Sequence, residues 1–261
     1  MWIPSTWLTV IAPTVGIGGS VMLWGMFHPR SRVMGPLVFQ APPAEPGDPP
    51  RVALTFDDGP TPQSTPAVLD ELKRVGAPAA FFVVGLNVQR HPHLLRRIHD
   101  DGHLIANHSF HHDRQGLWGL NGFWRRQLDE TDDAIADIIG RRPAMFRPPM
   151  GLKHWHMMQE VKYGGHVCVT WTRRALDGRR RTKSKKIVKR LVKARDGEVL
   201  LLHDGHEPDR PCSRQATADA IVPLVNQLRD RGVEIVRLDE LLQLPAYQPI
   251  EEDEPAGSGW A

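Results

Sequence analysis

The sequence is poor in cysteine. Its two cysteines, Cys168 and Cys212, stand far apart in 261 residues and form no C-x-x-C pair. Two cysteines are too few for a disulfide framework, and zinc ribbons and redox motifs require the closer spacing. Cys168 lies in an apolar run, so we expect it in the core, although a single bridge to Cys212 stays open. The chemistry of the chain is therefore sought in other residue types.

Charged side chains are absent from residues 2–27. This uncharged stretch is longer than the roughly 20 residues that cross a bilayer, so residues 1–28 are predicted to be a membrane anchor. A signal peptide is the alternative, but no Lys or Arg precedes the apolar run and no clear small-x-small cleavage site follows it. Arg30 and Arg32 follow the segment, and by the positive-inside rule they favour a cytoplasmic location for the remainder.

Two further segments lack a regular apolar period. Residues 29–50 include the run APPAEPGDPP and are predicted to be a Pro-rich, semi-rigid linker. Residues 245–261 are rich in proline and acidic residues and are predicted to be a disordered tail. These limits leave residues 51–244 as the folded domain.

The net charge of +3 comes from one local excess of basic residues. Between residues 173 and 193, where a basic helix is predicted, Asp177 is the only acidic residue. This stretch is either a solvated surface or a contact for anionic lipid headgroups or an anionic glycan. Because no aromatic residues interleave with the charges, nucleic acid is not an expected partner.

Short apolar runs alternate with amphipathic stretches through the domain, which is typical of an α/β fold. The expected strands are residues 52–56, 79–84, 104–107, 145–146, 166–172, 198–202 and 233–236. The expected helices are residues 65–75, a segment from 87, and residues 123–139, 154–162, 183–195 and 216–231. Seven strand-helix units predict a barrel, whose functional residues lie at the carboxyl ends of the strands.

The first expected strand ends in two adjacent carboxylates, Asp57 and Asp58, followed by a Gly-Pro turn. Adjacent like charges resist joint ionisation unless a cation or a guanidinium compensates them. An Asp-Asp-Gly turn is also common as plain turn chemistry. The pair therefore indicates a site only together with other residues.

Such residues follow three later strands. His108 and His112 are four apart, a spacing that lets two imidazoles face one metal ion, although a chain with 13 histidines also produces it by chance. Arg147 precedes a diproline and suits the role of keeping a second carboxylate ionised, or is a surface residue near a turn. His203 follows an apolar strand beside a carboxylate, as a general acid or as a strand cap.

Together the segments TFDDGP, HSFHH, RPPMG, an aspartate at Asp177 and LLHD resemble the polysaccharide deacetylase family over residues 51–242. The domain of this family is also called the NodB-homology or carbohydrate esterase family 4 domain. The resemblance implies an incomplete (β/α)7 barrel that removes N-linked acetyl groups from sugars. An O-acetyl esterase is an alternative, and an inactive membrane-tethered glycan-binding module is another, less favoured because the implied metal triad is complete.

The resemblance also implies the metal site. It makes Asp58, His108 and His112 the ligands of a divalent metal ion, usually Zn²⁺, with Co²⁺ or Ni²⁺ as alternatives. It makes Asp57 the catalytic base, tethered by Arg147.

The acid and the substrate contacts follow in the same way. The resemblance implies that His203 is the catalytic acid, oriented by Asp177, and that Leu201, Met150 and Pro149 contact the substrate. Where the family usually has a tryptophan after the orienting aspartate, this chain has Gly178, so one wall of the acetyl pocket is missing or supplied by another residue. Met150 replaces a common tyrosine, but its implied role is a backbone N–H donor to the oxyanion, which any non-proline residue offers.

An anchored domain on a ten-residue Pro-rich spacer reaches at most roughly 30 Å from the bilayer. The expected substrate is therefore an acetylated glycan or glycolipid close to the membrane. The charge pattern favours the cytoplasmic side and the habit of the family favours the cell envelope, so the side of the membrane stays open.

Overall fold

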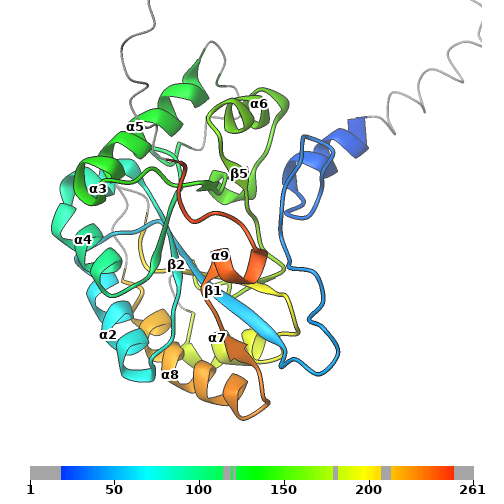
Figure 1. Ribbon diagram of the computed structural model, residues 1–261, viewed down its shortest axis with the longest axis vertical. Coiled ribbons are helices and arrows are strands. Elements are labelled where there is room, and N and C mark those ends of the chain that lie inside the picture. Colours follow the sequence, from blue (N-terminus) through cyan, green and yellow to red (C-terminus); the bar gives the residue numbers. More distant parts are fainter. Residues whose placement is uncertain (1–18, 114–118, 120–121, 179–181, 207–212, 250–261) are drawn as a thin grey trace, which may run out of the picture.

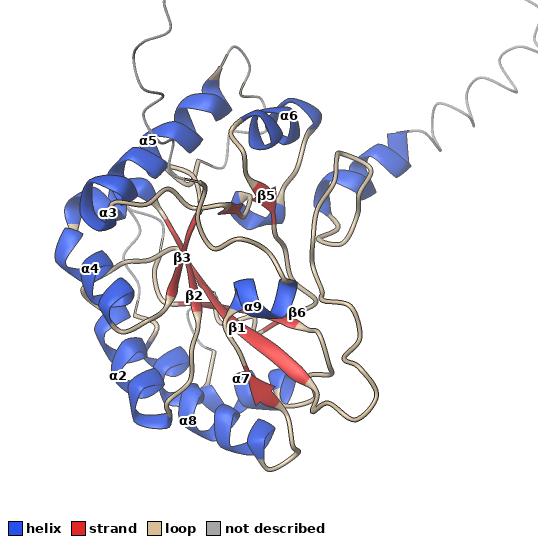
Figure 2. Ribbon diagram, viewed as in Figure 1, coloured by secondary structure: helices blue, strands red, loops and turns tan. Residues whose placement is uncertain are grey.

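The computed structural model describes residues 19–113, 119, 122–178, 182–206 and 213–249. Its centre is one curled parallel sheet (Figure 2) in the order β5-β4-β3-β2-β1-β7-β6, with β8 paired to β1. The strands are β1 Arg51–Asp57, β2 Ala80–Val83, β3 Leu104–Asn107, β4 Met145–Phe146, β5 Val167–Cys168, β6 Arg173–Arg174, β7 Val199–His203 and β8 Glu234–Ile235. This curled parallel sheet fits the predicted incomplete (β/α)7 barrel.

Helices cover the outside of the sheet, with α2, α3, α4, α5 and α8 along one side (Figure 1). The helices are α2 Thr65–Val75, α3 Gly85–Arg90, α4 Pro92–Asp100, α5 Phe123–Ile139, α6 Trp155–Tyr163, α7 Ser184–Leu191, α8 Gln215–Arg229 and α9 Leu238–Leu242, with a short 3-10 helix η2 at Pro149–Gly151. The amphipathic faces of these helices bury their apolar side chains against the sheet.

Alternation along β1 explains how the barrel and its polar groups are arranged. Val52, Leu54 and Phe56 belong to the cluster that packs under the outer helices. Ala53 belongs to a second cluster inside the curl, together with small side chains from neighbouring strands. Since side chains alternate between the two faces of a strand, Asp57 lies on the same inner face as Ala53 and reaches the barrel interior.

The ends of the sheet, β5 and β6, are not paired with each other among the described residues. Residues 38–41 lie across this opening, where Val38 bridges to Val169 and Gln40 bridges to Glu198. Met34 and Leu37 are also buried. Part of the segment assigned to the linker thus packs against the barrel.

Three local features differ from the expected elements. The helix expected from residue 87 is two helices, α3 and α4, and Pro92 at the start of α4 suits the first turn of a new helix. The strand expected over residues 166–172 is shortened to β5. The strand β6 was not expected, because Arg173 and Arg174 begin the basic stretch, of which only α7 is helical among the described residues.

The described parts of the two ends of the chain differ from the predicted anchor and tail. Residues 19–27 form a helix, and the described part of the chain contains no helix with the length and apolar character needed to span a bilayer. The membrane helix is therefore not supported, and residues 1–18 of that prediction lie outside the described residues. At the other end Tyr247, inside the predicted tail, bridges to Pro143. Residues 250–261 lie outside the described residues, as does Cys212, whereas Cys168 is a buried free thiol.

Candidate active site

A cavity of about 310 Å³ opens at the carboxyl ends of β1, β3 and β7. This is the rim where barrel folds gather their functional residues. Its lining residues are Asp57, Asp58, His108, His112, Met150, Trp171, Arg174, Leu176, Gly178, Leu201, His203 and Arg214. Seven of the ten residues predicted from the sequence are among them.

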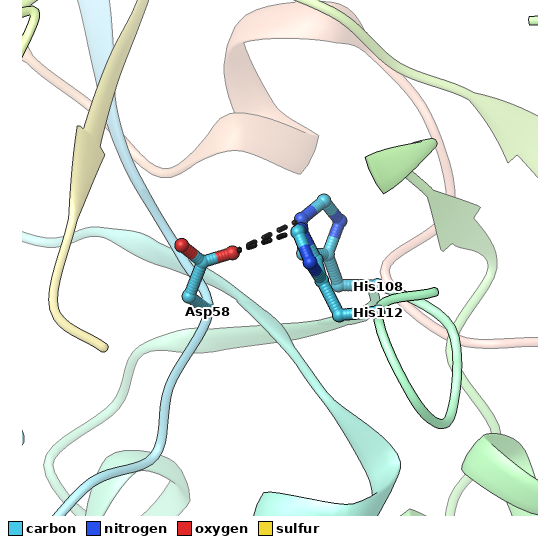
Figure 3. Close-up of side chains that lie close together, drawn as sticks. All are labelled: Asp58, His108 and His112. Atoms are coloured by element: carbon cyan, nitrogen blue, oxygen red, sulfur yellow. Dashed lines mark ion pairs between the residues drawn. The ribbon is translucent and has the colours of Figure 1, made fainter. Parts of the chain in front are cut away.

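Three of these side chains converge on one point. Asp58, His108 and His112 each offer a ligand atom, and the three atoms lie within 4.8 Å of one another. Figure 3 shows the Asp58 carboxylate facing both imidazoles, with its Oδ1 at 3.5 Å from His108 Nε2 and 3.2 Å from His112 Nε2. A carboxylate and two imidazoles are a donor set typical of zinc and other divalent transition metals.

The orientation of His108 supports this set. Its Nδ1 lies 2.7 Å from the carbonyl oxygen of Arg147. Because a carbonyl only accepts, Nδ1 carries the hydrogen and the lone pair of Nε2 is directed at Asp58. An imidazole fixed in this way through its other nitrogen is the usual arrangement of a metal ligand. The residues present therefore fit a divalent cation.

Asp58 is held in its ionised form. Burial acts to raise the pKa of its carboxyl, but the neighbouring His112 and His108 lower that pKa well below its ordinary value. Its backbone carbonyl accepts a hydrogen bond of 2.8 Å from the buried Asn87 side chain. This hydrogen bond fixes the turn that carries the Asp58 carboxylate.

The loops of the site are strained. Among the described residues, six non-glycine residues have positive φ, and five of them are on these loops: Asp58, Ser109, His112, Met150 and Leu176. Each such conformation costs roughly 1–3 kcal/mol and persists only where the surrounding structure enforces it. This concentration of strain marks the rim as a functional region.

Asp57 is held by Arg147, as the motifs led us to expect. The Arg147 side chain is fully buried, and its NH1 donates to Asp57 Oδ1 at 2.6 Å and to Thr55 Oγ1 at 2.9 Å. The guanidinium also lies 3.8 Å from the centre of the Phe82 ring. A buried arginine in this position fixes one carboxylate oxygen and leaves the other, Oδ2, 3.8 Å from His108 Nε2.

His203 is paired with Asp177. Its Nδ1 lies 2.8 Å from Asp177 Oδ1, and its backbone N–H donates to Asp177 Oδ2 at 2.9 Å. Burial acts to lower the pKa of His203, but the Asp177 carboxylate raises it, and the resulting pKa is about 9. The imidazole is therefore protonated at neutral pH, as a general acid must be.

The predicted substrate residues occupy different positions. Leu201 and Met150 line the cavity, whereas Pro149 is buried at the start of η2 and is absent from the lining. Trp171 supplies part of the wall and packs on Gly151, where a Cβ would stand 2.5 Å from the indole. Trp171 therefore forms one part of the cavity wall, whereas a Cβ at Gly178 would meet no atom of the described residues within 4 Å.

Sequence reasoning missed a buried carboxylate beneath the site. Asp204 is the carboxylate next to His203 in the sequence, but its Oδ2 accepts a hydrogen bond of 2.6 Å from Thr65, and His203 pairs with Asp177. Burial raises the pKa of Asp204 to about 7. A Cβ on Gly59 would lie 2.1 Å from that same oxygen, so only glycine fits there. In the sequence, only the glycine of DDG and the aspartate of LLHD hinted at this close approach of Gly59 to Asp204.

Arg214 was also missed. It is buried, and its guanidinium donates to the carbonyl oxygens of Gly205 at 2.7 Å and Asp177 at 3.2 Å. These bonds join the loop after β7 to the loop that carries Asp177. No motif in the sequence indicated this residue.

The geometry defines a class of protein: a metal-dependent hydrolase with an ion site open to substrate, a carboxylate beside that site and a protonated histidine within the same cavity. Comparison with known proteins gives the family. Residues 44–169 match the family model described as polysaccharide deacetylase. A peptidoglycan-N-acetylglucosamine deacetylase of Bacillus cereus is 33% identical over 197 residues, which cover 74% of this chain and 88% of that protein. The chain belongs to the polysaccharide deacetylase family, as predicted from the motifs.

Two further similar proteins support this family assignment. The peptidoglycan-N-acetylglucosamine deacetylase PgdA of Listeria monocytogenes is 34% identical over 73% of this chain, but the chain spans only 38% of its length. A crystal structure of a peptidoglycan N-acetylglucosamine deacetylase, in complex with 4-naphthalen-1-yl-N-oxidanyl-benzamide, superposes with a TM-score of 0.74 at 26% identity and covers 81% of this chain and 95% of that one. The fold and the family are thereby consistent.

Proposed function

We propose that the protein is a metal-dependent deacetylase that hydrolyses the N-acetyl groups of a membrane-proximal glycan or glycolipid and releases acetate. The observation that carries this proposal is the arrangement around one cavity of a candidate metal triad, a carboxylate held by a buried arginine and a histidine held by a carboxylate. The names of the peptidoglycan deacetylases similar to this chain support an N-acetylated glycan as substrate.

The residues divide the reaction between them. A divalent cation held by Asp58, His108 and His112 would polarise the acetyl carbonyl and lower the pKa of the attacking water. Asp57 accepts the proton of that water, and the contact with Arg147 keeps its carboxylate ionised and oriented. The contribution of the Met150 backbone N–H to the oxyanion stays a prediction.

The acid favours amide over ester hydrolysis. An amine leaves from carbon only when its nitrogen receives a proton, whereas an alkoxide depends less on such help. His203, with a pKa of about 9 beside Asp177, holds this proton at neutral pH. The carboxylate of Asp177 then stabilises the imidazolium until the proton is transferred. This argument supports an N-deacetylase over the O-acetyl esterase alternative.

The first test is acetate release by the metal-loaded full-length protein from N-acetylated and O-acetylated glycans and glycolipids. We expect acetate from the N-acetylated members, with the free amino sugar as the second product. His203→Ala should lose more rate on amides than on activated esters, because activated leaving groups need no proton. Equal losses on both substrates would contradict the acid role, and binding without turnover would favour the glycan-binding module.

The location beside a membrane is a second part of the proposal. The helix at residues 19–27 exposes the side chains of Val21, Met22, Leu23, Trp24 and Phe27 by 48–57% each. This helix is fixed to the barrel, since Lys153 donates from its backbone to Met26 O at 3.1 Å and from Nζ to His28 O at 2.9 Å. An exposed apolar surface of this kind suits the interfacial region of a bilayer. The basic stretch at residues 173–193 is proposed to face anionic headgroups.

The membrane proposal is tested by cell fractionation and protease protection. The full-length protein is expected in the membrane fraction. A tag is placed after Trp260, and its protection from protease is compared in intact and permeabilised cells. This comparison shows on which side of the membrane the catalytic domain lies. Replacement of Leu23 and Phe27 by serine should weaken membrane association, because both side chains are exposed. Recovery of the wild-type protein in the soluble fraction would refute this part of the proposal.

A further inference from the structure

We propose that Arg174 recognises an anionic group, a phosphate or a carboxylate, on the acetylated sugar that enters the cavity. This inference rests on the proposed function and narrows its substrate class. It assigns a specificity role to one residue of the basic stretch at residues 173–193, which the sequence indicated only as a whole.

The position of Arg174 follows from strand register. In the parallel pairing of β6 with β7, Arg174 is opposite Leu201, and Leu201 is opposite Thr55 of β1. Residues opposite one another on neighbouring strands point to the same face of a sheet. Arg174 therefore belongs to the layer just below Asp57 and His203, which are also opposite one another, and it lines the cavity beside Leu201.

The charge of Arg174 is available. Its neighbour Arg173 points to the other face and is paired with Glu198 at 2.8 Å. Arg147 is bound to Asp57, and Arg214 is engaged with backbone carbonyls. No carboxylate among the described residues forms an ion pair with Arg174, whose side chain is exposed.

Space for a substituent lies in the same wall. Gly178 lines the cavity with Arg174, and no atom of the described residues comes within 4 Å of the position that a Cβ would take there. The tryptophan usual in the family at this position would occupy that space. The planar guanidinium binds phosphate and carboxylate groups through two parallel hydrogen bonds, which matches the proposed ligand chemistry.

The experiment compares wild-type protein, Arg174→Gln and the control Lys73→Gln, which removes a positive charge on the exposed surface of α2. Each metal-loaded protein is tested with N-acetylglucosamine, N-acetylglucosamine 1-phosphate and N-acetylmuramic acid, by acetate release and by titration calorimetry. Comparison of the phosphate probe with the carboxylate probe shows which of the two anionic groups Arg174 recognises.

We expect the wild-type protein to bind at least one anionic probe more tightly than the neutral sugar. Arg174→Gln should weaken that binding by about 10- to 100-fold, the usual effect of a hydrogen bond to a charged group, with a much smaller loss on the neutral sugar. Lys73→Gln should resemble the wild-type protein. Equal losses on neutral and anionic probes, or no preference for an anion in the wild-type protein, would overturn the inference.

The two readouts separate this inference from the proposed function. If no probe releases acetate but Arg174→Gln selectively loses the anionic probe, the recognition role stands and the deacetylase proposal fails. If acetate is released from all probes without dependence on Arg174, the deacetylase proposal stands. In that case Arg174 acts only as a charged residue that protects the edge strand β6 from pairing with other chains.

Discussion

His108→Ala is expected to abolish both metal binding and turnover. The wild-type domain should retain about one divalent ion after dialysis, as an open three-residue site implies. Removing a group that hydrogen-bonds to a metal ligand already lowers metal affinity by about 10- to 100-fold. Removing a ligand itself should therefore lower metal affinity by more than about 100-fold. The effect should be large because the ring has two functions: its Nε2 faces Asp58 and its Nδ1 fixes the Arg147 carbonyl.

The same motif supplies a matched control. His111 is exposed and pairs with Gln127, and it is not part of the triad. His111→Ala should therefore keep the ion and the activity, whereas His112→Ala should lose both. Metal content is measured by mass spectrometry, and the thermal unfolding of each variant is recorded with and without added zinc. Undiminished metal content in the double variant His108→Ala/His112→Ala would contradict the assignment.

The elements that carry the site were predictable because each is a local pattern. The apolar run before Asp57 ends at a turn, and a parallel strand of a barrel delivers the residue after it to the common rim. The same rule applies to His108 and to His203, which follow β3 and end β7. Their convergence follows from the fold class and needs no knowledge of side-chain packing.

The remaining features depend on contacts between distant segments. The Arg147 carbonyl that orients His108 is a backbone group, and no residue type encodes it. Asp204 follows His203 in the sequence but accepts its hydrogen bond from Thr65, 139 positions away. Arg174 lies on a two-residue edge strand inside the basic stretch, where no apolar run indicates a strand.

Asp57→Asn is expected to keep the metal ion and to lose rate by about 10²–10⁴, the usual contribution of a positioned general base. Asparagine has nearly the same shape, so its Oδ1 can still accept the hydrogen bond from Arg147, but its amide cannot take a proton from water. Metal binding should persist because the triad uses the adjacent carboxylate of Asp58. Asp58→Asn is the matched comparison, and it should lose the ion.

Stability must be measured beside the rate of Asp57→Asn, because the variant leaves the buried Arg147 guanidinium without its charged partner. Breaking a buried ion pair typically costs about 3–5 kcal/mol, and the retained hydrogen bond should reduce that cost. We therefore expect a lower unfolding temperature, with the rate loss persisting after correction for the folded fraction. If Asp57→Asn instead released the ion while Asp58→Asn retained it, the roles of the two aspartates would be exchanged.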